Sequence, residues 1–169
     1  MKIKITNIPE GISDFDFAVS IKELVLENST VFSEPVAVHL EIQKFASNYL
    51  FTIQAKYKGH FTCDRCLSEF VKEIEASTRI TYTADETLFV ENSDDIRLLH
   101  PHQVILNLVP ELREMLLLSL PVKVLCSKGC QGICPNCGAN LNHETCQCQK
   151  TTYDSRWDAL KSLIDQEEK

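Results

Sequence analysis

The chain has 169 residues, of which 44% are hydrophobic and 24% charged, so it has the composition of an ordinary globular protein with a core of its own. Its formal net charge of −7 argues against a general nucleic-acid coat, because such proteins neutralise phosphates with an excess of Lys and Arg. No apolar signal segment opens the sequence, and the longest apolar run, 115–118, is far too short to span a bilayer. We therefore expect a cytoplasmic protein that does not enter a membrane.

The first half of the chain predicts an antiparallel sheet built around one hairpin. Hydrophobic and polar side chains alternate along 36–43 and again along 49–58, with a turn sequence at 46–48 between them. This period of two is typical of half-buried strands. The side chains expected on the buried face are Val36, Val38, Leu40 and Ile42, followed by Tyr49, Phe51, Ile53, Ala55 and Tyr57. The aromatic residues among them could stack on nucleic-acid bases, but their shared face favours a core role.

Further strands are expected on both sides of this hairpin. We expect 58–59 to turn the chain into a short strand that ends at Cys63, and another strand to occupy 70–82. Residues 1–5 and 15–19 are candidates for additional strands.

A Leu-rich helix is predicted after an acidic connection. Residues 84–101 are acidic and predict little regular structure, whereas 108–119 predict a helix that Asn107 caps and that tolerates Pro110 in its first turn. It has more apolar side chains than one narrow stripe along a helix can hold. We therefore expect the helix to be buried on most sides against the sheet or to be covered by a partner. These elements predict an α+β fold, with the β-rich domain and its helix occupying 1–125.

The composition changes after residue 125. Residues 126–150 are rich in Cys, Gly, Asn and Pro and have almost no apolar side chains, so burial alone cannot order them. A short C-terminal helix and tail are expected over 151–169, with Asp154 or Ser155 as the cap and Trp157 on its apolar face.

The eight cysteines predict metal binding. In a reducing cytoplasm, Cys-x-x-Cys pairs are typical of zinc sites, because the two-residue spacer lets both thiolates face one ion. The expected zinc ligands are Cys63, Cys66, Cys126, Cys130, Cys134, Cys137, Cys146 and Cys148.

The spacing suggests two groups of four and hence one or two Zn²⁺ ions. The sequence CPNCGANLNHETCQC can wrap one ion with Cys134, Cys137, Cys146 and Cys148, and this leaves Cys63 and Cys66 to pair with Cys126 and Cys130. His143 is a spare ligand, and filling of only one site is the alternative. A redox role for Cys63 and Cys66 is disfavoured, because thioredoxin-like motifs lie between a strand and a helix and here strands flank the pair.

Sequence motifs of catalysis are missing from the chain. It contains neither a zinc-protease nor a deaminase signature, no GxSxG and no phosphate-binding glycine loop. A site of four cysteines is closed and structural, unlike a catalytic zinc that keeps one position for water. We therefore expect a protein that is not an enzyme and takes no small-molecule substrate.

The order of these features resembles the YceD family, the large ribosomal RNA subunit accumulation proteins of bacteria and plastids. The resemblance rests on CDRCL at 63–67, the acidic connection, the Leu-rich helix that ends in Leu-Pro, the loop CPNCGANLN and the closing DSRWDAL, and it covers about residues 2–163. It implies a non-enzymatic factor that supports 23S ribosomal RNA accumulation and large-subunit biogenesis.

Two partners are compatible with these features. The protein could bind the pre-ribosomal large subunit through 23S rRNA, with Arg65, Lys123, Lys128 and Arg156 as candidate contacts. Alternatively, it is an acidic zinc-binding adaptor that holds a basic ribosomal or assembly protein and never contacts RNA. The negative net charge favours the adaptor.

Overall fold

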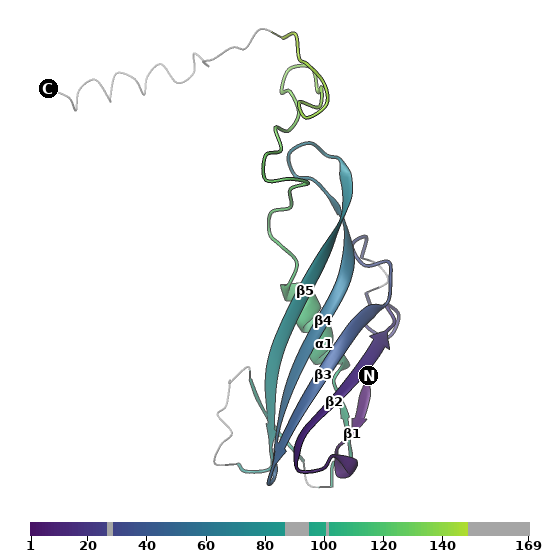
Figure 1. Cartoon of the computed structure of the whole chain (residues 1–169), viewed down its shortest axis with the longest axis vertical. Coiled ribbons are helices and arrows are strands. Elements are labelled where there is room, and N and C mark those ends of the chain that lie inside the picture. The colour runs from purple at the N-terminus through teal and green to yellow at the C-terminus, as the bar shows by residue number, and fades with distance from the viewer. Residues whose placement is uncertain (27–28, 87–94, 101, 149–169) are drawn as a thin grey trace, which may run out of the picture.

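The computed structural model describes residues 1–26, 29–86, 95–100 and 102–148. These residues form an elongated molecule in which a long twisted sheet lies against α1 (Figure 1). The expected α+β class is confirmed. The elements are β1 (Lys2–Lys4), η1 (Ile5–Asn7), β2 (Gly11–Val19), β3 (Val36–Phe45), β4 (Asn48–Thr62), β5 (Glu69–Thr83), β6 (Ile96–Leu98), β7 (Ile105–Asn107) and α1 (Val109–Leu118).

The main sheet has five strands in the order β2-β3-β4-β5-β6. Its neighbours are antiparallel except for β5 and β6, which run parallel. A second sheet pairs β1 with β7, so the N-terminus lies beside the start of α1. The amide N–H of Leu108 donates to the carbonyl of Met1 at 3.1 Å, an ordinary hydrogen-bond distance.

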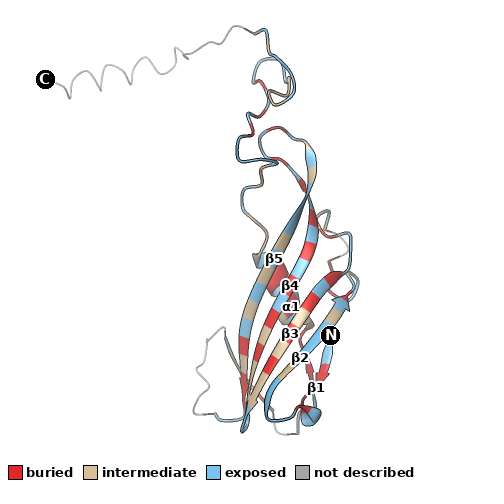
Figure 2. Cartoon of the chain, viewed as in Figure 1, coloured by how far each residue is buried: buried red, intermediate tan, exposed pale blue. Residues whose placement is uncertain are grey.

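The predicted hairpin is β3 and β4. Phe45 pairs with Asn48, so the turn consists of Ala46 and Ser47, and Asn48 already belongs to β4. Buried and polar residues alternate along both strands, as the banding in Figure 2 shows. The side chains of Phe51 and Ile53 are fully buried and Tyr57 nearly so, which confirms that this aromatic face is core.

The turn predicted at residues 58–59 is wrong. β4 continues through both residues to Thr62, and Gly59 pairs with Lys72 of β5. A Cβ at Gly59 would lie 2.5 Å from the ring of Phe61, so this glycine marks the close approach of an aromatic ring and not a turn. The β4–β5 hairpin that results is long, and its tip extends beyond the other strands of the sheet (Figure 1). Cys63 directly follows β4 at this tip.

The other strands largely follow expectation. The strand predicted over 70–82 is β5, whose Ile80 and Tyr82 are buried. The connection 84–101 was expected to have little regular structure, but it contains β6, which pairs with β5. β6 contains the apolar residues Ile96 and Leu98, although the connection as a whole is acidic.

The helix α1 starts one residue later than predicted, and fewer of its apolar side chains are buried than expected. Asn107 ends β7 and Leu108 is the cap residue, although the Asn107 side chain still accepts the amide N–H of Val109 at 3.3 Å. Leu112 and Leu116 are fully buried against the sheet, whereas Leu118 is 78% exposed. The helix is therefore buried along one face and not on most sides.

Two tyrosines fix α1 on the sheet. The Tyr57 hydroxyl lies 2.8 Å from Oγ of Ser119, and Tyr82 donates to Glu111 at 3.0 Å. Burial, together with the Glu111 carboxylate, raises the pKa of Tyr82. This anchoring sets where the chain leaves the helix toward the later cysteines. The C-terminal helix predicted over 151–169 lies outside the described residues, and no helix within them is long and apolar enough to cross a membrane.

Candidate metal centres

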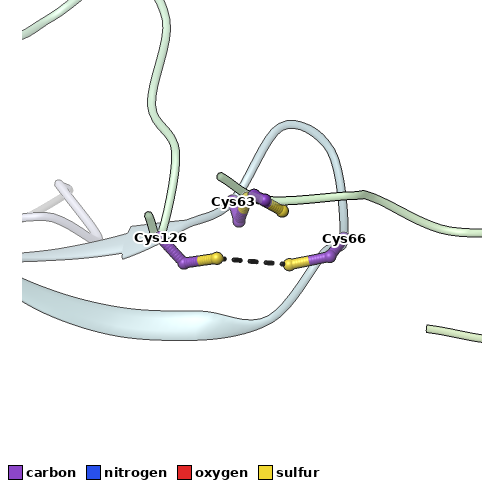
Figure 3. A group of neighbouring side chains, drawn as sticks. Cys63, Cys66 and Cys126 are labelled. Atoms are coloured by element: carbon purple, nitrogen blue, oxygen red, sulfur yellow. Dashed lines mark hydrogen bonds between the residues drawn. The ribbon is translucent and has the colours of Figure 1, made fainter. Parts of the chain in front are cut away.

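The first cysteine group joins the tip of the β4–β5 hairpin to the chain after α1. Its members are Cys63, Cys66, Cys126 and Cys130, whose Sγ atoms all lie within 4.8 Å of one another. Cys66 and Cys126 point toward each other across the site (Figure 3). Cys63, Cys66 and Cys130 are buried, with Phe70 and Leu125 packed around them.

The spacing of these sulfurs fits a tetrahedral ion and not a disulfide. Sγ of Cys63 lies 3.7 Å from Sγ of Cys130, and Sγ of Cys66 lies 3.6 Å from Sγ of Cys126. Disulfide sulfurs are about 2.0 Å apart. Four thiolates at about 2.3 Å from a tetrahedral Zn²⁺ lie about 3.8 Å from one another. The donor set and its dimensions therefore fit zinc.

Asp64 brings the distant part of the chain to this site. Its Oδ2 accepts the amide N–H of Val124 at 2.6 Å, and its own amide N–H donates to the carbonyl of Val124 at 2.9 Å. This two-bond contact places Cys126 beside Cys66, although the two cysteines are 60 positions apart in the sequence.

The second group lies entirely in the C-terminal segment. Its members are Cys134, Cys137, Cys146 and Cys148, and their Sγ atoms also lie within 4.8 Å of one another. Sγ of Cys146 is 3.3 Å from Sγ of Cys134 and 3.6 Å from Sγ of Cys137. Cys134 alone is buried in this group, whereas three of the four cysteines are buried in the first, so this site is more open to solvent.

Both groups are built on the same backbone turn. In the first, the carbonyl of Cys63 accepts the amide of Leu67 and its amide donates to the carbonyl of Ser68, each at 2.9 Å. In the second, Cys134 makes the equivalent bonds with Gly138 at 2.9 Å and Ala139 at 2.8 Å. The residue after the second cysteine has positive φ in both turns, 59° at Leu67 and 75° at Gly138. The two Cys-x-x-Cys units are thus local repeats of one ligand-presenting turn.

These turns favour the thiolate form of their first cysteine. Burial alone raises the pKa of Cys63, but the backbone N–H groups of Cys126, Cys66 and Arg65 outweigh it and lower that pKa to about 6. The pKa of Cys134 is also lowered to about 6, mainly by the backbone N–H groups of Cys137 and Asn136. A thiolate is the form that binds metal.

One later cysteine of each group, Cys126 in the first and Cys148 in the second, shows the opposite effect. The neighbouring thiol of Cys66 raises the pKa of Cys126 to about 12, and that of Cys146 raises the pKa of Cys148 to about 12. Four thiolates so close together repel one another, and a divalent cation at the centre removes that repulsion. The geometry therefore favours a bound cation.

The structure brings together the same two groups of four cysteines that the spacing suggests. His143, the spare ligand, is exposed and belongs to neither group. Of the candidate contacts, Lys123 and Lys128 are exposed, and Arg156 lies outside the described residues. Arg65 has a structural contact, since its Nη1 donates to the carbonyl of Cys130 at 2.9 Å.

Sequence reasoning missed three polar residues beside the first group. They are Ser68, Asn140 and Asn142, each within hydrogen-bond distance of a cysteine sulfur or of one another. Asn140 and Asn142 belong to the loop CPNCGANLN at 134–142, but only the folded structure shows which side chains of the first group they contact.

Comparison with known proteins places these features in one family. The family model of the large ribosomal RNA subunit accumulation protein YceD matches residues 51–164, a range that contains most of β4 and all of β5, α1 and the eight cysteines. The chain belongs to the YceD family. The expected resemblance is thereby confirmed over residues 51–164, and the family's name refers to accumulation of large-subunit ribosomal RNA.

One curated relative of the YceD family supports the same assignment. The "Large ribosomal RNA subunit accumulation protein YCED homolog 1, chloroplastic" of Arabidopsis thaliana is 33% identical over 55 residues, which is 32% of this chain and 17% of that protein. The chain thus matches less than a fifth of the length of this relative. No solved structure matches the chain.

Proposed function

We propose that the protein is a non-enzymatic factor that supports 23S ribosomal RNA accumulation and large-subunit biogenesis, and that it folds around structural Zn²⁺. The observation that carries the proposal is the YceD match over 51–164, which includes both groups of four cysteines. The sites would hold one ion each, with all eight cysteines as ligands.

Zinc is the metal that fits these donors best. Sets of four soft thiolates select Zn²⁺ or iron–sulfur clusters, while carboxylate-poor sites of this kind do not suit Mg²⁺ or Ca²⁺. An ion bound by four cysteines keeps no position for water or substrate, so its role is structural. This is the physical basis for proposing a protein that is not an enzyme and has no small-molecule substrate.

The proposed partner is the pre-ribosomal large subunit in the cytoplasm. Contact could be made with 23S rRNA or with a ribosomal or assembly protein. Lys123 and Lys128 are exposed beside the first cysteine group and are proposed RNA contacts, with Arg156 as a further candidate from the sequence. Arg65 is a weaker candidate, because its guanidinium already donates to Cys130.

A specific surface favours the adaptor as a second candidate. On the outer face of the main sheet, Asp14 of β2 lies opposite Glu41 of β3 in the strand register, and Asp16 lies opposite His39. All three carboxylates lie on the solvent side of β2 and β3, and the whole chain carries a net charge of −7. Such a face suits a basic ribosomal protein better than a phosphate backbone.

Depletion of the protein tests the proposed function. In depleted cells we expect a lower ratio of 23S to 16S rRNA and fewer large subunits on density gradients, with recovery when the wild-type chain is supplied. An unchanged ratio would contradict the proposal. Binding of the purified protein to 23S fragments across a salt series separates the two candidates, because direct RNA contact weakens steeply with salt and an adaptor shows no binding even at low salt.

A further inference from the structure

The two cysteine groups are connected by polar contacts from one loop. Asn142, between Cys137 and Cys146, donates from Nδ2 to Sγ of Cys130 at 3.4 Å. Asn140 of the same loop donates from Nδ2 to Oγ of Ser68 at 3.2 Å. That Ser68 hydroxyl lies 3.4 Å from Sγ of Cys66. Two asparagines of the second group's loop therefore reach ligands of the first group, one directly and one through a hydroxyl.

The orientation of the Asn142 amide is fixed by its neighbours. Its Oδ1 accepts the amide N–H of Gln131 at 2.8 Å, a donor that only the amide oxygen can satisfy. The nitrogen end must then face the sulfur of Cys130. Oδ1 of Asn140 accepts from Nδ2 of Asn142 at 2.8 Å and from its backbone N–H at 3.0 Å, which holds the side chain from the other side.

The backbone holds this loop tightly against the hairpin tip. The amide of Ile133 donates to the carbonyl of Arg65 at 3.2 Å. A Cβ at Gly132 would lie 3.1 Å from that same carbonyl oxygen, and Gly132 has φ of 79°. The close contact between the two groups thus requires glycine at this position.

The loop that carries both asparagines is closed by the second group of cysteines. It leaves that group at Cys137 and returns at Cys146, whose sulfurs are 3.6 Å apart. Residues 138–145 contribute few apolar groups that could order the loop by burial. An ion in the second site would therefore fix the asparagines where they contact Cys130 and Ser68.

Hydrogen bonds to a metal-bound thiolate stabilise its charge and orient it, and loss of such an outer contact typically weakens metal binding roughly 10- to 100-fold. We propose that the two sites bind metal as a coupled pair, in which filling the second site raises the affinity of the first through Asn142. This inference rests on the proposed zinc sites and not on the ribosomal role.

Cadmium binding to the full chain tests the coupling. ¹¹³Cd substitutes for zinc in thiolate sites and gives one NMR resonance for each site, and competition with a chelator gives the affinity of each. In Asn142→Asp the acceptor for Gln131 remains, but a carboxylate oxygen replaces the N–H donor that faces Cys130. We expect first-site affinity to fall roughly 10- to 100-fold. Asn7→Asp makes the same substitution at an exposed position of η1, away from both cysteine groups, and should leave the first site unchanged.

A second variant removes the second site itself. Cys137→Ser with Cys148→Ser should abolish one resonance and weaken the first site as much as Asn142→Asp does. Adding Asn142→Asp to this variant should weaken it no further, because both changes remove the same contact. Unchanged first-site affinity in either variant, or effects that add in the combination, would overturn the coupling. Wild-type protein that binds no cadmium with its thiols reduced would instead contradict the zinc sites themselves, and the coupling with them.

Discussion

Asp64 and Val124 exchange two hydrogen bonds, one from the amide of Val124 to Oδ2 of Asp64 and one from the amide of Asp64 to the carbonyl of Val124. The contact joins the hairpin tip to the segment between α1 and Cys126. It holds these two distant parts of the chain together beside the first cysteine group.

We predict that Asp64→Ala weakens this junction. The variant loses the side-chain acceptor for Val124, and because the residue is exposed we expect a loss of about 1 kcal/mol in the free energy of unfolding. Asp64→Asn keeps an acceptor oxygen and should lose less. Thermal unfolding of the metal-loaded protein measures both; equal stability of Asp64→Ala and the wild type would show that the contact contributes nothing.

The comparison of the two Cys-x-x-Cys turns predicts a stabilising change at Leu67. This residue has φ of 59° and is 63% exposed, while the equivalent Gly138 has φ of 75°. Positive φ costs an L-residue roughly 1–2 kcal/mol, and glycine's greater freedom in the unfolded chain offsets part of the relief. We expect Leu67→Gly to raise stability by about 0.5–1 kcal/mol and Gly138→Ala to lower it. Destabilisation by Leu67→Gly in denaturant unfolding would contradict the equivalence of the turns.

Substitutions in the core under α1 should change the free energy of unfolding by a larger amount. Leu112 and Leu116 are fully buried, so Leu116→Ala should cost about 3 kcal/mol through lost burial and the cavity left behind. Leu118 is 78% exposed, and Leu118→Ala should change the free energy of unfolding by less than about 0.5 kcal/mol. Urea unfolding followed by circular dichroism separates the two; similar costs would mean that a surface covering Leu118 exists in solution.

The two cysteine groups should differ in how much each stabilises the folded chain. The first closes a loop of 60 residues between Cys66 and Cys126, whereas the second closes only the segment from Cys134 to Cys148. The entropy removed from the unfolded chain grows with loop length. We therefore predict that Cys63→Ser with Cys66→Ser lowers the melting temperature more than Cys137→Ser with Cys148→Ser, and that chelation of the wild type lowers it at least as much as the first variant. A redox role for Cys63 and Cys66 would instead leave the melting temperature unchanged.

The sequence predicted the parts of the structure that depend on local pattern. Alternating residues located β3, β4 and β5, and cysteine spacing suggested the two groups of four that the fold brings together. These signals are readable because strand periodicity and the Cys-x-x-Cys turn each involve only neighbouring residues.

Features that depend on distant contacts could not be predicted. Gly59 was expected to form a turn because glycine often does, whereas here it makes room for the ring of Phe61. β6 pairs with β5 despite lying in an acidic segment, and Asn142 contacts Cys130 only because the second loop folds onto the hairpin tip. In each case the deciding neighbour comes from tertiary packing and has no sequence signature.

The most direct test of the central claim is native mass spectrometry of the full chain purified without added metal. We predict a mass increase equal to two Zn²⁺ ions less four protons per chain at a given charge state, because all eight cysteines lie in two groups of four with the dimensions of tetrahedral zinc sites. Loss of both ions on acidification should return the mass of the chain with eight free thiols. A folded chain that carries no metal, or that carries disulfides in place of metal, would contradict the claim.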